Sequence, residues 1–223
     1  MSGDLESAVQ ISAAGVILDG DLVVPAHTAG VVLFAHGSGS SRHSPRNRMV
    51  AERLHQAGYA TLLMDLLTAE EDQIDSRTRR FRFDIPRLAS RLTGAIGWLN
   101  DNAETARMPL ALFGASTGAA AALVAAAKVP DHLQLVISRG GRPDLAGQAL
   151  ERVRIPTLLI VGGRDLEVLD LNKAAAARLA GPVDIAVVPG ATHLFEEPGA
   201  LDRVVELALD ALRRHMAASS SQQ

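Results

Sequence analysis

The sequence predicts a single α/β domain. Its sheet should be mostly parallel, with about eight strands, an antiparallel N-terminal edge and helices on both faces. Short apolar runs alternate with helical patterns along most of the chain, which is typical of parallel strands joined by crossover helices. The segment before Pro25 indicates strands joined by a tight turn. The length of 223 residues suits one domain, placed at residues 1–216, with Ala217–Gln223 as a disordered tail.

The strands follow from two patterns. The N-terminal segment predicts three short strands, Val9–Ser12, Gly15–Leu18 and Leu22–Pro25, with Asp19-Gly20 as a hairpin turn between the last two. The later strands are continuous apolar runs, as expected for strands that are buried on both faces. These runs are Val31–Ala35, Thr61–Leu66, Leu110–Phe113, Leu133–Ile137, Thr157–Val161 and Asp184–Val188.

Five helices follow from capping signals and apolar periodicity. Ser44-Pro45 is an N-cap followed by a proline at the first helical position, and it predicts a helix to about Ala57. Pro86 opens another helix, whose apolar residues recur every three or four positions. The remaining predicted helices are Thr117–Lys128, Leu169–Leu179 and about Ala200–His215.

The composition excludes several classes of protein. The chain has no cysteine, so a disulfide, a cysteine-based metal site and a thiol nucleophile are excluded. A formal charge of −3 and an aromatic content of 3% give no footprint for nucleic acid or an anionic membrane surface. Two uncharged stretches, Leu22–Ser41 and Met108–Ala127, each fit two elements joined by a turn better than a membrane span. Because no basic region precedes an apolar stretch at the N-terminus, we expect a cytoplasmic protein.

A nucleophile is expected where the strand Leu110–Phe113 ends, because sites in parallel sheets lie beyond the carboxyl ends of the strands. The next five residues have the pattern G-x-S-x-G, centred on Ser116, and an alanine-rich helix follows. This context places a serine on a sharp strand-to-helix turn, where the helix N-terminus favours developing negative charge. A glycine-rich turn without chemistry is the alternative, and the strand–turn–helix context favours the nucleophile.

A serine hydroxyl needs a base, and the base needs an acid to orient it. His193 lies between the last strand and the last helix, so its ring can reach the strand ends. Asp165 follows another apolar strand and gives the chain order Ser, Asp, His. Asp170 and Asp144 are the alternative acids. We therefore expect Ser116 as nucleophile, His193 as general base and Asp165 as the orienting acid.

Two backbone N–H groups are expected to form an oxyanion hole. One belongs to Thr117, the residue after the nucleophile, and the other to Ser38, in the glycine-rich loop after Val31–Ala35. A dinucleotide-binding loop is the competing interpretation of that segment, but the third glycine of the fingerprint is absent. His36 is expected to hold the loop by a hydrogen bond. We expect no cofactor and no metal, since no H-x-x-x-H pair occurs.

The sequence resembles the α/β-hydrolase superfamily and, within it, the dienelactone hydrolase-like group. The resemblance covers the order of elements from about Val9 to His215. Dienelactone hydrolases use a cysteine nucleophile, whereas this chain has Ser116. The resemblance implies hydrolysis of a carboxylic ester, lactone or thioester through an acyl-enzyme. The matching pieces are His36-Gly37-Ser38-Gly39-Ser40, Gly114-Ala115-Ser116-Thr117-Gly118, Gly162-Gly163-Arg164-Asp165 and Gly190-Ala191-Thr192-His193.

The segment Thr68–Asp84 is dense in charge and follows a strand end, so it should lie beside the mouth of the site. Charged runs are usually exposed, which favours local pairing of its charges at the surface. The alternative is that arginines recognise an anionic acyl or leaving group. The candidate arginines for that role are Arg79, Arg82, Arg139 and Arg142.

Other functions share the same motifs. A thioesterase, an acyltransferase or a small peptidase of this fold would also pass through an acyl-enzyme. A non-catalytic binding protein could retain the fold, because fold does not determine function. The intact set of serine, histidine and aspartate favours an enzyme that acts on a small-molecule ester-type substrate.

Overall fold

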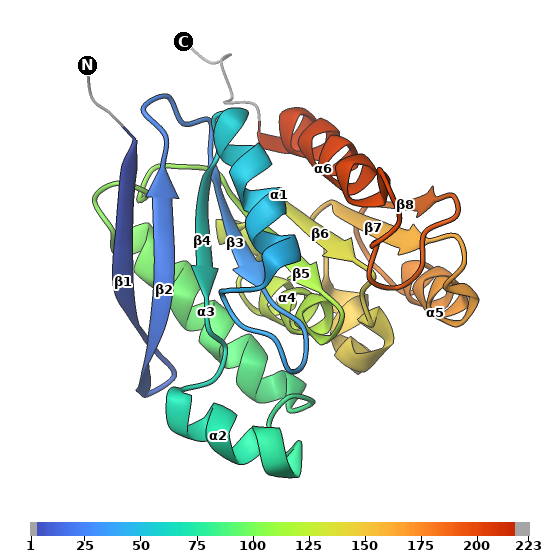
Figure 1. Ribbon diagram of the computed structural model, residues 1–223, viewed down its shortest axis with the longest axis horizontal. Coiled ribbons are helices and arrows are strands. Elements are labelled where there is room, and N and C mark those ends of the chain that lie inside the picture. Colours follow the sequence, from blue (N-terminus) through green and yellow to red (C-terminus); the bar gives the residue numbers. More distant parts are fainter. Residues whose placement is uncertain (1–3, 217–223) are drawn as a thin grey trace.

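A mixed sheet of eight strands runs through residues 4–216, the part of the chain that the computed structural model describes (Figure 1). The strand order is β1-β2-β4-β3-β5-β6-β7-β8. β2 pairs antiparallel with both β1 and β4, and all other neighbours are parallel, as predicted. The predicted tail, residues 217–223, lies outside the described residues. The strands are β1 (Leu5–Ala13), β2 (Val16–Val24), β3 (Val31–Ala35), β4 (Ala60–Met64), β5 (Leu110–Ala115), β6 (Leu135–Arg139), β7 (Thr157–Gly162) and β8 (Val183–Val188).

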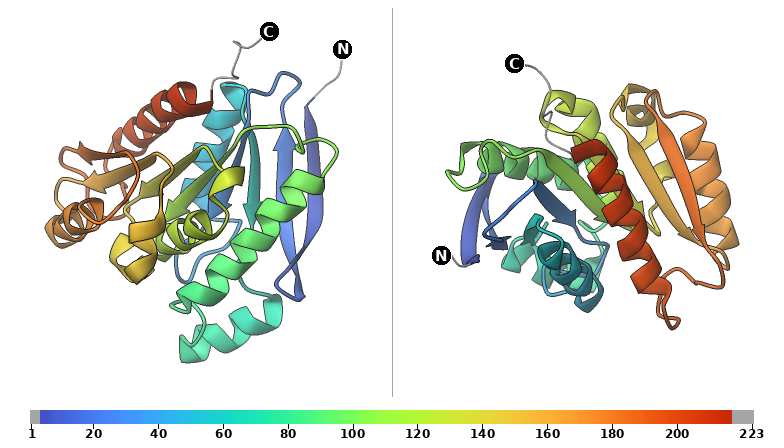
Figure 2. Two further views of the ribbon diagram at one scale, coloured as in Figure 1. Left: turned by 180° about the vertical axis from the view of Figure 1, so that it is seen from behind. Right: turned by 90° about the horizontal axis from the view of Figure 1, so that it is seen from above.

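Helices cover both faces of the sheet (Figure 2). The helices are α1 (Pro45–Gln56), α2 (Ala69–Thr78), α3 (Ile85–Asp101), α4 (Thr117–Lys128), α5 (Leu166–Ala176) and α6 (Ala200–Met216), with 3₁₀ segments η1 (Pro130–His132) and η2 (Pro143–Arg152). α3, α4 and α5 lie on one face, and α1 and α6 on the other. α2 lies beyond the carboxyl end of β4 (Figure 1). Within residues 4–216, no helix is both long and apolar enough to span a membrane.

The buried strands show why continuous apolar runs predicted them. In β3, Val31, Leu33 and Ala35 pack on the α3 and α4 side, whereas Val32 and Phe34 pack on the α1 and α6 side. Successive side chains of a strand point to opposite faces, so a strand covered on both faces must be apolar at every position. The carboxyl ends of β3, β5, β6, β7 and β8 therefore meet at one edge of a rigid core.

The N-terminal prediction of three strands was wrong. Two nine-residue strands are present, joined at Ala14 and Gly15, whose φ angles of 51° and 78° suit a two-residue hairpin turn. Gly20, predicted to lie in a turn, lies inside β2. A Cβ at this position would be 2.8 Å from Cδ1 of Ile11 and 3.1 Å from Cδ1 of Leu62. Glycine is needed there for close packing of the strands, not for a turn.

Three helical segments were missed, and one helix was displaced. α2 has no apolar face, so periodicity could not reveal it, although its capping box of Thr68 and Glu71 was present in the sequence. η1 and η2 were also missed. α5 spans Leu166–Ala176 rather than Leu169–Leu179. β6 extends to Arg139, two residues further than predicted, which places Arg139 at the edge of the sheet where the strand ends meet.

Candidate active site

A strained turn joins β5 to α4 at Ser116. Its φ of 51° and ψ of −121° are costly for a residue with a side chain. A Cβ at Gly114 would lie 2.7 Å from the backbone nitrogen of Ala119, and one at Gly118 would lie 2.5 Å from the carbonyl oxygen of His36. Glycine at both positions therefore lets strand, helix and the neighbouring loop approach closely. This is the geometry of a nucleophile elbow.

His193 and Asp165 meet from the loops that follow β8 and β7. Nδ1 of His193 lies 2.7 Å from Oδ2 of Asp165. A Cβ at Gly162 would lie 2.6 Å from the carbonyl oxygen of Thr192, so glycine allows these two loops to touch. The side chain of Asp165 is 16% exposed and that of His193 is 38% exposed. The carboxylate can therefore orient the ring, which leaves Nε2 as the ring atom available for proton transfer.

The two alternative acids have other partners. Asp170 forms an exposed ion pair with Lys173, with 3.2 Å between Oδ1 and Nζ. Asp144 accepts two hydrogen bonds from Arg142, at 2.9 and 2.8 Å. The structure thus brings Asp165, and neither alternative acid, to His193.

One cavity of about 270 Å³ is lined by several of the predicted site residues. Ser116 and His193 both line it, together with Ser38 from the loop after β3. Ligand pockets in proteins commonly measure about 300–1,000 Å³, so this one suits a small substrate. Thr117 is the first residue of α4, and its N–H has no acceptor within the helix. The N–H groups of Thr117 and Ser38 therefore remain the candidate oxyanion donors.

Residues 36–40, called the oxyanion loop from here on, are held by His36. The Leu66 N–H donates to Nε2 of His36 at 3.0 Å, and Nδ1 lies 2.9 Å from the carbonyl oxygen of Gly37. These two bonds together require a neutral ring that carries its proton on Nδ1. Burial lowers the pKa of His36, which favours the same neutral form. The predicted structural role of His36 is confirmed.

Arg139 is the one predicted substrate-binding arginine that lines the cavity. The residue is 7% exposed. One guanidinium nitrogen, Nη2, donates to Oδ1 of Asn47 at 3.1 Å, and buried Nε has no hydrogen-bond partner among the described residues. Burial, followed by repulsion from Arg46, lowers the pKa of Arg139 to about 10. The guanidinium is thus buried on the cavity that Ser116 also lines, and it has no carboxylate partner within residues 4–216.

The other three candidate arginines do not line this cavity. Arg142 is paired with Asp144. Arg82 is paired with the buried carboxylate of Asp75. Arg79 is exposed at the end of α2, where its φ is 55°. Local pairing, the favoured interpretation of the charged segment, therefore holds for Arg82.

Sequence reasoning missed three residues that shape the site. Arg46 and Asn47, at the start of α1, line the cavity beside Arg139, and Nη1 of Arg46 lies 2.9 Å from Oε1 of Glu196. The only signal was their position just after a strand-end loop. Phe195, two residues after His193, has a φ of 56° and is 2% exposed, so it anchors the histidine loop in the core.

No group of three potential metal ligands occurs within residues 4–216.

The strand order, the serine elbow and the histidine–aspartate pair together define an α/β hydrolase. The family model described as "Alpha/beta hydrolase domain" matches residues 28–220, so the chain belongs to that family. A solved dienelactone hydrolase from Anabaena variabilis is 56% identical, with a TM-score of 0.93 over 96% of this chain and 99% of that chain. The protein is therefore a dienelactone hydrolase-like α/β hydrolase.

More distant structures share the fold. A dienelactone hydrolase-like promiscuous phosphotriesterase from metagenomic libraries is 18% identical, with a TM-score of 0.75 over 96% of this chain and 99% of that chain. Curated relatives from two Mycobacterium tuberculosis strains, CDC 1551 and H37Rv, are 56% identical over 211 residues and bear the provisional name phosphoribosyl transferase. The match covers 95% of this chain and 47% of those relatives, so the chain spans about half their length.

Proposed function

We propose that the protein is a serine hydrolase that cleaves a small carboxylic ester, lactone or thioester through an acyl-enzyme on Ser116. One observation carries this proposal: Ser116, on a strained elbow, and His193, hydrogen-bonded to Asp165, line the same cavity. A serine becomes a nucleophile when an oriented base can accept its proton. The cavity volume of about 270 Å³ supports a small substrate.

The proposed reaction uses these groups in two stages, acylation and deacylation. Oγ of Ser116 attacks the substrate carbonyl carbon while Nε2 of His193 takes the hydroxyl proton. The N–H groups of Thr117 and Ser38 stabilise the negative oxygen of the tetrahedral intermediate. The imidazolium returns the proton to the leaving group, which departs and leaves an acyl ester on Ser116. A water molecule, deprotonated by His193, then attacks the acyl carbon and releases the acid.

We further propose that the substrate carries a negative charge, which Arg139 binds. Burying a cation without an anionic partner is unfavourable, so a substrate carboxylate or similar anion would supply the missing partner. Arg46, on the same cavity, adds positive charge, although Glu196 partly neutralises it. Because Arg139 and Ser116 line one small cavity, the anion would lie close to the scissile bond.

Acyl-enzyme chemistry fits this cavity better than the phosphoribosyl transfer for which the curated relatives are named. The elbow, the base and the oxyanion donors act on a carbonyl group. A thioesterase, an acyltransferase and a small peptidase share the acyl-enzyme and differ in leaving group or acceptor. A panel of p-nitrophenyl esters of graded length, lactones and acyl-CoA thioesters separates these activities.

Replacing Ser116 with alanine tests the proposal. S116A should lose turnover of the best ester by about 10³-fold or more, because nucleophile and base act as a unit. A fluorophosphonate probe should label the parent protein and not the variant. S76A, which changes an exposed serine on α2, is the matched control and should label like the parent. Near-parental turnover by folded S116A, or a parent protein that resists the probe, would contradict the proposal.

A further inference from the structure

Part of the charged segment, residues 68–84, packs against the oxyanion loop, although most of its side chains are exposed. The space left between them measures about 10 Å³ and is lined by loop residues together with Asp72, Arg82 and Leu88. Such a space holds about one water molecule. The segment and the start of α3 therefore support the loop that supplies the proposed Ser38 donor.

The first support passes through Leu66. Its N–H donates to Nε2 of His36 at 3.0 Å, and its carbonyl oxygen accepts a hydrogen bond from Nη1 of Arg91 at 2.5 Å. Both backbone polar groups of Leu66 are thus used, one toward the oxyanion loop and one toward α3. The Arg91 side chain is only 3% exposed, so this contact places a buried charge two hydrogen bonds away from the loop.

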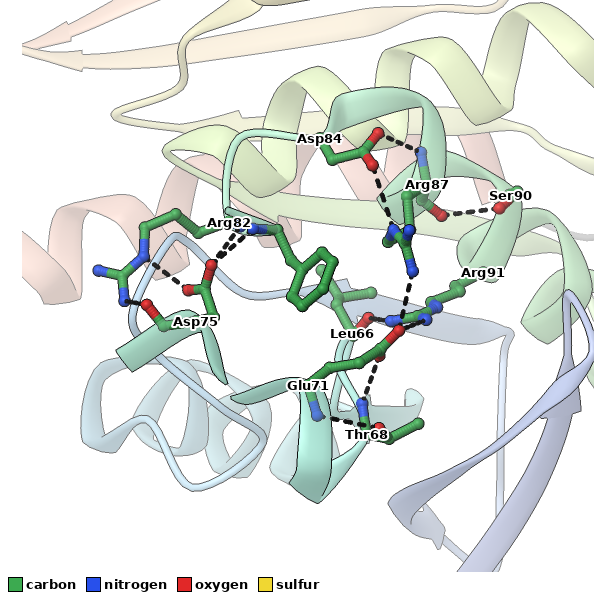
Figure 3. Close-up of polar contacts among 10 residues, drawn as sticks. Leu66, Thr68, Glu71, Asp75, Arg82, Asp84, Arg87, Ser90 and Arg91 are labelled. Carbon is green, nitrogen blue, oxygen red and sulfur yellow. Dashed lines mark hydrogen bonds and ion pairs between the residues drawn. The ribbon is translucent and has the colours of Figure 1, made fainter. Parts of the chain in front are cut away.

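Glu71 holds Arg91 in place (Figure 3). Nη2 of Arg91 lies 2.6 Å from Oε1 of Glu71, and Nη1 of Arg87 lies 2.9 Å from the same oxygen. The other carboxylate oxygen accepts the N–H of Thr68 at 2.9 Å. Burial raises the pKa of Glu71, but the hydrogen bonds from Arg91 and Thr68 outweigh it and lower the pKa, so the carboxylate is charged.

A second support reaches the other end of the loop. Asp75, which is 1% exposed, accepts the N–H of Phe81 at 2.6 Å and Nε of Arg82 at 2.6 Å (Figure 3). Gly39 has a φ of +69°, and a Cβ there would lie 3.2 Å from Nη1 of Arg82. The Arg82 guanidinium, which is held by Asp75, therefore lies against the loop, and it does not line the substrate cavity.

We propose that Arg91, held by Glu71, is a positioning residue for the oxyanion hole and acts through Leu66 and His36. This inference rests on the proposed function, because it assigns a role in the same reaction. Buried ion pairs add little net stability compared with apolar residues of the same size, but they impose fixed directions. Oxyanion donors must lie about 2.7–3.1 Å from the developing charge, so small shifts of the loop matter. Arg91 fixes the position of the Leu66 carbonyl group, and so the position of Leu66 relative to His36.

The test compares an aryl acetate with the matching aryl thionoacetate, in which sulfur replaces the carbonyl oxygen. Sulfur is a weak hydrogen-bond acceptor, so only the oxygen ester benefits from a well-formed oxyanion hole. The variant is R91M, and R87M is the matched control because Arg87 also binds Glu71 but makes no bond to Leu66. R91K tests whether a cation restores the effect. Fluorophosphonate labelling counts active serines in every sample.

R91M should lower kcat for the oxygen ester by about 10-fold to 100-fold with little change in KM, less than the about 10²–10³-fold expected when a donor is removed. The ratio of oxygen-ester to thionoester rates should fall by a similar factor. A mere loss of folded protein lowers both rates equally and leaves this ratio unchanged. R87M should keep the parental ratio, and R91K should recover part of it.

Several results would overturn the proposal. The positioning role of Arg91 is rejected if folded R91M keeps the parental ratio of oxygen-ester to thionoester rates. It is also rejected if R87M lowers this ratio as much as R91M does. In both cases the proposed hydrolase function stands. A parent protein that neither labels nor turns over esters removes both. If R91M does not fold, E71Q is measured instead. It should lower the ratio in the same direction, and an unchanged ratio in E71Q rejects the proposal.

Discussion

Replacing Arg139 with methionine should separate substrate recognition from stability. Burial and the nearby Arg46 lower the pKa of Arg139 to about 10, well below the usual value of an arginine. A pKa difference of this size corresponds to about 3 kcal/mol of unfavourable free energy for the charged form in the folded protein. Methionine removes that cost, but it leaves Oδ1 of buried Asn47 without its 3.1 Å hydrogen bond, a loss of about 1–3 kcal/mol. R139M should therefore unfold with a free energy equal to that of the parent or up to about 2 kcal/mol higher.

The same variant should lose activity toward an anionic ester, even though its stability is unchanged or higher. A hydrogen bond to a charged group contributes about 1.5–3 kcal/mol, so kcat/KM for an anionic ester should fall by about 10-fold to 150-fold. A neutral ester of similar size should change little. The assay pairs a p-nitrophenyl hemiester of a short dicarboxylic acid with p-nitrophenyl butyrate, and urea unfolding gives the stability.

The control for this comparison is R142M, since the Arg142 side chain is paired with Asp144 and does not line the cavity. It should leave the preference between the two esters unchanged. The reasoning is refuted if R139M lowers the rates for both esters equally, or if it destabilises the protein by more than about 2 kcal/mol, because Arg139 would then be a structural residue.

Two further predictions concern the acid Asp165 and the pH dependence of stability. D165N should lower kcat on the order of 10⁴-fold, because the amide no longer stabilises the imidazolium, whereas D170N should stay close to the parent; equal losses in both variants, measured with the best ester, would reject Asp165 as the orienting acid. Burial lowers the pKa values of His36 and His55 below 6.5, so the unfolded chain binds protons that the folded chain does not. The contribution of these two neutral histidines to the free energy of unfolding is therefore fully present above about pH 6.5 and is lost as the pH decreases toward 5. The free energy of unfolding should fall with a slope of up to about 1.4 kcal/mol per pH unit for each histidine. Urea unfolding at several pH values checks this, and H36N should have a shallower slope; a parental slope in H36N would show that His36 contributes nothing.

The parts of the protein that sequence alone determined are those in which one short segment carries the whole signal. The apolar runs of the buried strands, the G-x-S-x-G elbow at Ser116, and the chain order of Ser116, Asp165 and His193 predicted the class of fold and the residues that the structure brings to one edge of the sheet. Periodicity and turn chemistry are local, so these features need no knowledge of distant neighbours.

Tertiary structure decided which charges are buried and what they contact. Arg139 and Arg142 lie three positions apart, yet Arg139 lines the cavity and binds Asn47, 92 residues away, whereas Arg142 pairs with its neighbour Asp144. Gly20 was mistaken for a turn because its reason, close packing against Ile11 and Leu62, comes from other strands. The support of the oxyanion loop by Arg91 likewise joins elements far apart in the chain. Burial and pairing depend on which surfaces meet after folding, and that information is spread over the whole sequence rather than held in one segment.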